Sequence, residues 1–300
     1  MKKTLLALFI TGVPVASMAQ SSVTLYGVAN VGVSKLNGQA TQMDSDGLMI
    51  DAPSRLGVRG AEDIGSGSKV GFNFETGLSL EKGDTMAVGG GFWGRTSVLW
   101  IEGAWGTLKM GRSLNPSFFG VAAWEIVNAV TYNLPGAIYS YGGSGPRNSS
   151  QFSYRTPALG GFSAELAYVL KPDNGDKSKW DGNVIYTNGP LALGLSAHKT
   201  SGDKLGYVIG SKYNFGSFAV SASYNDAKQI RRGFILGASK QFGAFRLAAA
   251  VSRDTRNIAR KYTNVMLEGR YHLSKRTSIY AAALRRDEGN NYGLGLRHGF

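Results

Sequence analysis

Large apolar residues alternate with small or polar residues in two clear segments of this chain. In 217–224 the even-numbered residues are Phe, Val, Ala and Tyr, and serine or alanine stands between them. In 291–300 the even-numbered residues run from Tyr292 to Phe300, with glycine, asparagine or arginine between them. A strand turns successive side chains to opposite faces, so strict alternation predicts strands with two different environments.

Turn signals divide the rest of the chain into sixteen predicted strands. Short connections rich in Gly, Pro and Asn, such as 62–67 and 214–217, alternate with longer polar ones, of which 113–148 is the longest. The predicted strands are 22–34, 54–62, 68–80, 92–102, 106–112, 149–156, 162–170, 180–187, 191–199, 205–213, 217–225, 232–241, 244–253, 260–272, 276–286 and 290–300.

This layout predicts an all-β fold, a 16-stranded antiparallel transmembrane β-barrel. Tight turns at one rim and loops at the other are typical of such barrels. An even number of strands places both chain ends at the same rim, where the first and last strands pair and leave no open edge in lipid. The alternative is a soluble secreted β-sandwich or β-solenoid. A soluble fold of that kind needs a dry apolar core, and an inner face of Gly, Ser, Ala, Asn, Lys and Arg does not form one. The same residues suit the wall of a water-filled lumen.

The first nineteen residues have the pattern of an export signal. Lys2 and Lys3 precede a mostly apolar run, and Ser17-Met18-Ala19 places small residues before the expected cleavage site. The run is shorter than the roughly 20 apolar residues of a membrane-spanning helix, the alternative reading. We therefore expect a signal peptide over 1–19 and one exported barrel domain over 20–300.

Composition excludes several classes of function. The chain has no Cys, which rules out disulfide frameworks, iron–sulfur sites and thiol nucleophiles. Residues 228–300 hold 15 Lys and Arg but only 4 Asp and Glu, so the net positive charge lies in the last quarter. These charges are spread between apolar residues rather than gathered in a tail, and an exported protein has little contact with nucleic acid, so no nucleic-acid partner is expected.

Motifs spread along the chain resemble the trimeric general porins of Gram-negative bacteria, in particular the β-proteobacterial and neisserial type of outer-membrane porin. Ser21-Ser22-Val23-Thr24-Leu25-Tyr26-Gly27 resembles the first strand of that family, and Phe300 its C-terminal aromatic residue. Further ordered matches are 54–65, Phe92-Trp93-Gly94-Arg95, 105–112 and Arg147-Asn148-Ser149-Ser150. The 281 residues left by signal removal are few for this family, and the connections after residue 180 look trimmed, which predicts a shallow outer vestibule.

The resemblance implies that the loop of about 113–148 folds into the barrel and narrows it; the alternative places this loop outside, against a neighbouring subunit. It also implies a pore constriction formed by Arg55, Arg95 and Arg147, which Arg112, at the end of the fifth predicted strand, joins. The loop lacks the family's more acidic character: Glu125 is its only acidic residue, and we expect it to be the only acid that opposes the arginines. Guanidinium groups stay charged at any relevant pH. A ring of fixed cations attracts anions and repels cations, so we expect an anion-selective pore.

The expected function is therefore passive diffusion of small hydrophilic, mainly anionic solutes across the outer membrane, by a homotrimer in contact with lipopolysaccharide. Two alternatives stay open. One is a solute-specific channel that uses Tyr132, Tyr139 and Tyr141 as stacking platforms. The other is a non-conducting structural or adhesive barrel.

No catalytic residue, cofactor or metal site is expected. Residues 106–113 nearly match a phosphate-binding loop, but a predicted strand runs through them and no helix follows as that loop requires. The histidines, His198, His272 and His298, have no metal-ligand spacing and no nucleophile beside them. Asp173, Asp176 and Asp181 flank an outer loop; a divalent-cation site there is a weaker reading than an ordinary solvated loop.

Overall fold

The computed structural model describes residues 22–86, 91–139, 141, 145–227, 231–256 and 260–300. The predicted signal peptide, 1–19, lies outside the described residues. Among the described residues, no helix is long and apolar enough to cross a membrane.

Sixteen long antiparallel strands form one wall in the described part of the chain. They are β1 (Ser22–Lys35), β3 (Arg55–Gly65), β4 (Ser68–Ser79), β6 (Thr96–Gly103), β7 (Gly106–Leu114), β8 (Arg147–Arg155), β9 (Phe162–Val169), β10 (Lys179–Asn188), β11 (Leu191–Thr200), β12 (Gly206–Asn214), β13 (Phe218–Ala227), β14 (Arg231–Phe242), β15 (Phe245–Asp254), β16 (Thr263–His272), β17 (Thr277–Arg286) and β18 (Gly289–Gly299). Two short strands in connecting loops, β2 (Thr41–Asp44) and β5 (Asp84–Met86), extend the pairing of β1 and β4.

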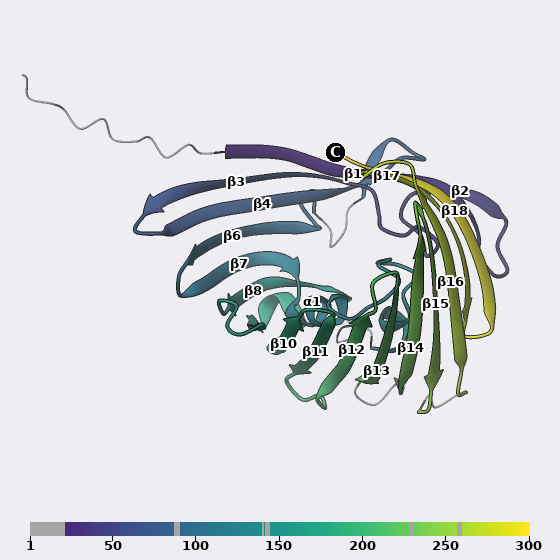
Figure 1. Cartoon of the computed structure of the whole chain (residues 1–300). Coiled ribbons are helices and arrows are strands. Elements are labelled where there is room, and N and C mark those ends of the chain that lie inside the picture. Colours follow the sequence, from purple (N-terminus) through teal and green to yellow (C-terminus); the bar gives the residue numbers. More distant parts are fainter. Residues whose placement is uncertain (1–21, 87–90, 140, 142–144, 228–230, 257–259) are drawn as a thin grey trace, which may run out of the picture.

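The wall closes on itself between its first and last strands. β1 pairs with β18 from Val28 opposite Gly299 to Lys35 opposite Tyr292. Beyond that register, Gly27 and Phe300 exchange two backbone hydrogen bonds of 3.1 Å. Figure 1 shows the resulting ring of strands, in which β1 lies next to β18. The predicted closed barrel of sixteen antiparallel strands is confirmed.

The two faces of the wall have the environments that the alternation predicts. On β13, Phe218 is 42% exposed on the outer face, whereas Ser221 on the inner face is 8% exposed. Aromatic pairs gather on the outer face near both rims, such as Phe162 with Tyr186 and Tyr168 with Trp180. Aromatic girdles of this kind mark the two interfaces of a membrane-spanning barrel.

The connections differ strongly between the two rims. At the rim that carries Ser22 and Phe300 the connections are short turns; β10 and β11, for example, are joined by Gly189 and Pro190. At the opposite rim the first four loops are longer, but later ones shorten to 201–205 and to Asp287-Glu288, both residues of which have positive φ. Short turns face the periplasm in such barrels, so the opposite rim, which carries the loops, faces the cell exterior.

The loop between β7 and β8 lies inside the ring (Figure 1). It contains helix α1 (Pro116–Ala122) and helix α2 (Leu134–Ile138), each begun by an asparagine cap whose side chain accepts a backbone N–H, Asn115 from Phe118 and Asn133 from Gly136. A further short helix, η3 (Pro172–Asn174), lies in the loop before β10.

Glycines make room for this loop on the inner wall. A Cβ atom at Gly194 would lie 2.2 Å from the carbonyl oxygen of Gly120, and one at Gly210 would lie 2.2 Å from the ring of Trp124. Asn183 on β10 also donates a hydrogen bond of 2.6 Å to the Pro116 carbonyl. The prediction that this loop folds into the barrel is confirmed.

Candidate pore site

Four arginines gather on one side of the inner wall. Arg55 begins β3, Arg95 directly precedes β6, Arg112 lies near the end of β7 and Arg147 begins β8. These strands follow one another around the wall, with β4 between β3 and β6. The register therefore brings together the four arginines that the sequence proposes for a constriction.

A carboxylate that sequence reasoning missed lies among them. Glu75 on β4 accepts a hydrogen bond of 2.7 Å from Arg95 Nε and lies 3.3 Å from Arg55 Nε. The Tyr26 hydroxyl lies 3.2 Å from the same carboxylate. The expectation that Glu125 is the only acid opposing the arginines is therefore wrong. The alternation on β4 places Glu75 on the inner face, but only the strand register shows that it reaches Arg55 and Arg95.

The backbone of Gly94 and Arg95 holds the other two arginines. Arg112 Nε donates to the Gly94 carbonyl at 2.5 Å, and Arg147 Nε donates to the Arg95 carbonyl at 2.8 Å. Arg112 also donates to Ser149 Oγ at 2.6 Å. Carbonyl and hydroxyl acceptors fix the orientation of a guanidinium group without neutralising its charge. The cluster thus joins four positive groups to one carboxylate.

Glu125 lies in the loop, away from these contacts. Its carboxylate accepts backbone N–H groups from Val127 at 2.9 Å and Asn128 at 2.6 Å. It lines a cavity of about 230 Å³ that is also lined by Lys212 and Arg246, on β12 and β15. Burial raises the pKa of Glu125 from 4.5 to about 7, although the two backbone donors and Arg246 favour its charged form.

A second charged cluster, formed by Asp51, Glu268, Arg270 and Arg297, joins the first outer loop to β16 and β18. Arg270 donates to Asp51 at 2.7 Å and to Glu268 at 2.9 Å, and Arg297 lies 3.3 Å from Asp51. Arg246 lies 3.7 Å from Glu268. Some of the basic residues in the last strands therefore face the lumen, where Asp51 and Glu268 neutralise part of their charge. The sequence does not reveal these ion pairs.

The loop aromatics that were considered as stacking platforms are buried against the wall. Tyr132 and Tyr139 are 0% exposed and Tyr141 is 6% exposed. The Tyr132 hydroxyl donates to Glu268, and the Tyr139 hydroxyl lies 2.8 Å from Nδ1 of His198. These rings anchor the loop and present no face to a solute.

The other candidate motifs occupy structural positions. Residues 106–113 lie within strand β7, so they do not form a phosphate-binding loop. Asp181 is buried on β10, 3.2 Å from Lys179 Nζ, and its carboxylate accepts the backbone N–H of Ser117. It therefore belongs to the anchor of helix α1 and not to a solvated cation site. His272 and His298 are exposed near the short-turn rim.

Comparison with known proteins places this geometry in a family. The family model described as Gram-negative porin matches residues 4–291. The chain is 34% identical over 217 residues to outer membrane porin protein 32 of Delftia acidovorans, which covers 67% of this chain and 61% of that protein. It is 29% identical over 190 residues to the major outer membrane protein P.IB of Neisseria gonorrhoeae, which covers 60% of this chain and 51% of that protein.

These alignments span less than two thirds of either relative's own length. Among solved structures, an anion-selective porin from Comamonas acidovorans superimposes with a TM-score of 0.79 at 26% identity, over 94% of this chain and all of that chain. The closed sixteen-stranded wall, the loop folded inside it and the family match lead to one conclusion: the chain belongs to the Gram-negative porin family and is a multi-pass β-barrel of the bacterial outer membrane.

Proposed function

We propose that this protein is a passive diffusion channel for small hydrophilic solutes across the outer membrane. Membership of the porin family and the closed barrel with an inward loop support this function. Transport of this kind makes and breaks no covalent bond, so the proposal includes no catalytic step. We also propose that residues 1–19 are removed during export, which the mass of the mature protein would test.

The channel prefers anions, and the observation that carries this proposal is the composition of the arginine cluster. Arg55, Arg95, Arg112 and Arg147 are opposed there by Glu75 alone among the described contacts. Fixed positive charge beside low-dielectric protein walls raises the local concentration of anions and excludes cations. The related Comamonas acidovorans porin is described as anion-selective, in keeping with this assignment.

The proposed constriction residues are the four arginines, with Glu75 beside them and Glu125 in the loop. A solute-specific channel built on loop tyrosines has less support, because those rings are buried. A non-conducting surface barrel predicts a folded protein without current. The proposed assembly is a homotrimer, as the family resemblance suggests, and the proposed surroundings are lipopolysaccharide and other outer-membrane lipid.

Planar-bilayer recordings under a salt gradient test the channel and its selectivity together. Discrete conductance steps with an anion-selective reversal potential are expected. Arg55→Ala and Arg147→Ala should each weaken that preference. Lys240→Ala is the matched control, because Lys240 lies on the outer face over the Phe242 ring and should leave the reversal potential unchanged. Cation preference would overturn the charge assignment, and a folded barrel that carries no current would overturn the channel.

A further inference from the structure

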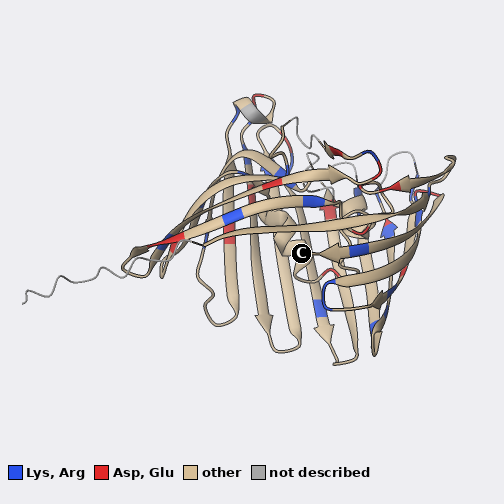
Figure 2. Ribbon diagram, turned by 90° about the horizontal axis from the view of Figure 1, so that it is seen from above, with Lys and Arg blue, Asp and Glu red and all other residues tan. Residues whose placement is uncertain are grey.

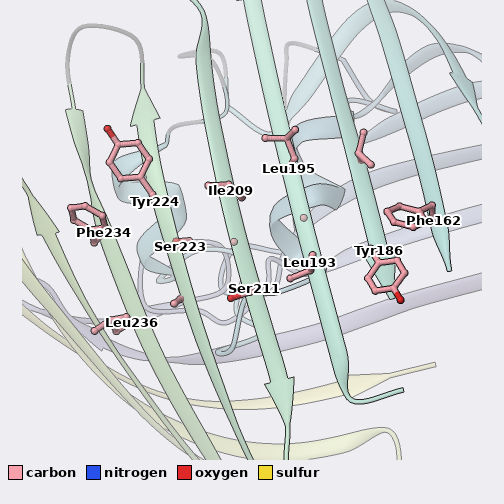
Figure 3. Close-up of a pocket in the computed structure, with 14 residues that line it drawn as sticks. Phe162, Tyr186, Leu193, Leu195, Ile209, Ser211, Ser223, Tyr224, Phe234 and Leu236 are labelled. Carbon is pink, nitrogen blue, oxygen red and sulfur yellow. The ribbon is translucent and has the colours of Figure 1, made fainter. Parts of the chain in front are cut away.

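The outer face of the barrel carries an apolar groove across strands β9 to β14. It encloses about 570 Å³, and Figure 3 shows the residues that line it, with Phe162 and Tyr186 at one end and Tyr224 and Phe234 at the other. The strand register arranges the lining in two rows. The first row is Phe162, Tyr186, Leu193, Ser211, Ala222 and Leu236, and the second is Val184, Leu195, Ile209, Tyr224 and Phe234.

Small side chains make this part of the wall concave. Ser211 and Ala222 stand opposite each other in the first row, between Leu193 and Leu236. Larger aliphatic and aromatic side chains surround them on all sides. The groove is thus a shallow apolar trough whose floor is formed by two small side chains.

The second row leads to a positive charge at the outer rim. Its next member after Phe234 is Arg253 on β15, one residue before that strand ends. Arg253 lies on the outer face and is exposed, and it donates a hydrogen bond of 2.7 Å to Thr263 Oγ1 on β16. The contact with a neutral hydroxyl orients the guanidinium group without neutralising it.

The row descends into the membrane as it leaves Arg253. Phe234 lies three residues from the outer end of β14, and Leu195 lies five residues from the outer end of β11. Four inter-strand steps of ~4.8 Å give a length of about 19 Å between Arg253 and Leu195. With strands tilted by about 40°, a row perpendicular to them drops about 12 Å, close to the ~15 Å half-thickness of the hydrocarbon core.

We propose that this groove binds one acyl chain of an outer-leaflet lipid A molecule, whose phosphate pairs with Arg253. The charge at the rim, the apolar trough and the depth of one leaflet together match a phosphorylated lipid that enters from the outer side. Arginine suits phosphate because its planar group offers paired donors. The proposal depends on the barrel lying in the outer membrane but not on conduction through its lumen.

The test measures lipid A that stays bound to the purified full-length protein, by native mass spectrometry after transfer from phosphatidylcholine vesicles doped with lipid A. Ala222→Trp fills the groove, and Arg253→Gln removes the charge. Each should lower retention about tenfold, which corresponds to ~1.4 kcal/mol. The controls are Ala249→Trp and Arg285→Gln, which alter outward-facing residues of β15 and β17 outside the groove.

Arg253→Gln keeps the test decisive if Ala222→Trp does not fold. Unchanged retention in Arg253→Gln, or equal retention of dephosphorylated lipid A, would overturn the proposed headgroup contact. Unchanged retention in folded Ala222→Trp would overturn the groove, and loss of oligomers in that variant without loss of lipid would assign the groove to a second copy of the chain. Single-channel conductance, recorded in parallel, keeps a failure of this proposal distinct from a failure of the channel function.

Discussion

The Tyr132 hydroxyl donates a hydrogen bond of 2.5 Å to Glu268 Oε2, and this contact joins the inward loop to strand β16. Both residues are 0% exposed. The Glu268 carboxylate also accepts a hydrogen bond from Arg270 and lies 3.7 Å from Arg246, so it links the loop to two basic side chains of the wall. The position of the loop therefore depends on a buried polar network as well as on apolar packing.

Tyr132→Phe should loosen the loop. The change removes a hydrogen bond to a charged acceptor, which contributes about 1.5–3 kcal/mol, while Arg270 still donates to the same oxygen. We expect more frequent brief closures in single-channel records and faster protease cleavage within the loop. Tyr154→Phe is the control, because that hydroxyl donates to the Trp105 carbonyl at the short-turn rim and does not contact the loop. Identical records for both variants would contradict the anchoring role.

Glu75→Gln should raise the anion preference of the channel. The substitution removes the carboxylate that pairs with Arg55 and Arg95. A unit charge ~4 Å from an ion in water changes its free energy by about 1 kcal/mol, so the permeability ratio should shift by up to roughly fivefold. Reversal potentials under a salt gradient give the ratio. The control is Glu102→Gln, which removes an acid at the short-turn end of β6 and should change the permeability ratio less. A lower anion preference in Glu75→Gln would refute the role of Glu75 as the acid that opposes Arg55 and Arg95.

Gly210→Ala should displace the loop from the wall toward the lumen. An added methyl group would overlap the Trp124 ring at 2.2 Å, and overpacking of this kind costs typically about 1–3 kcal/mol. Single-channel conductance should fall and the unfolding temperature should drop. Gly182→Ala is the control, because its nearest neighbour, at 3.3 Å, is the flexible end of Leu166. Equal conductance in the two variants would show that the loop does not rest on Gly210.

Anion preference should increase as the pH falls through about 7, the raised pKa of Glu125. Protonation removes a negative charge that faces Arg246, Lys212 and Glu268, so the lumen becomes more positive. Because this pKa is raised on folding, the stability contributed by Glu125 is fully present below 4.5 and is lost as the pH rises through about 7. Reversal potentials between about pH 9 and about pH 6 should show the step. If the same pH-dependent change in anion preference persists in Glu125→Gln, another titrating group causes it.

The wall of the barrel could be predicted from the sequence because lipid and lumen impose opposite demands on alternate residues. All sixteen wall strands were expected, with boundaries that differ by four residues at most; the largest difference is β6, which begins at Thr96 instead of residue 92. The short strands β2 and β5 could not be predicted, because their pairing depends on tertiary contacts rather than on a two-sided environment.

The site was only partly predictable. A family resemblance identified the four arginines, Arg55, Arg95, Arg112 and Arg147. It gives their positions in the chain but not the groups with which they pair. Glu75 was missed because its pairing with Arg55 depends on the register between β3 and β4, which alternation does not fix. The role of the loop tyrosines, which only the alternative of a solute-specific channel used as stacking platforms, could not be decided for a similar reason, since a tyrosine that stacks on solutes and one that anchors a loop have the same local sequence. The Asn-Pro pair at 115–116 was a usable signal for helix α1.

The seam between β1 and β18 has a consequence for assembly. Residues 28–35 can find their partners only when residues 292–299 are present, at nearly the full length of the chain. Contacts of such large sequence separation form late in folding. Until then both seam strands expose unpaired backbone groups, which are prone to associate with other chains. A chain truncated before Tyr292 should therefore accumulate as an open, aggregation-prone sheet. The barrel closes, and becomes compatible with lipid, only when the last strand has been added.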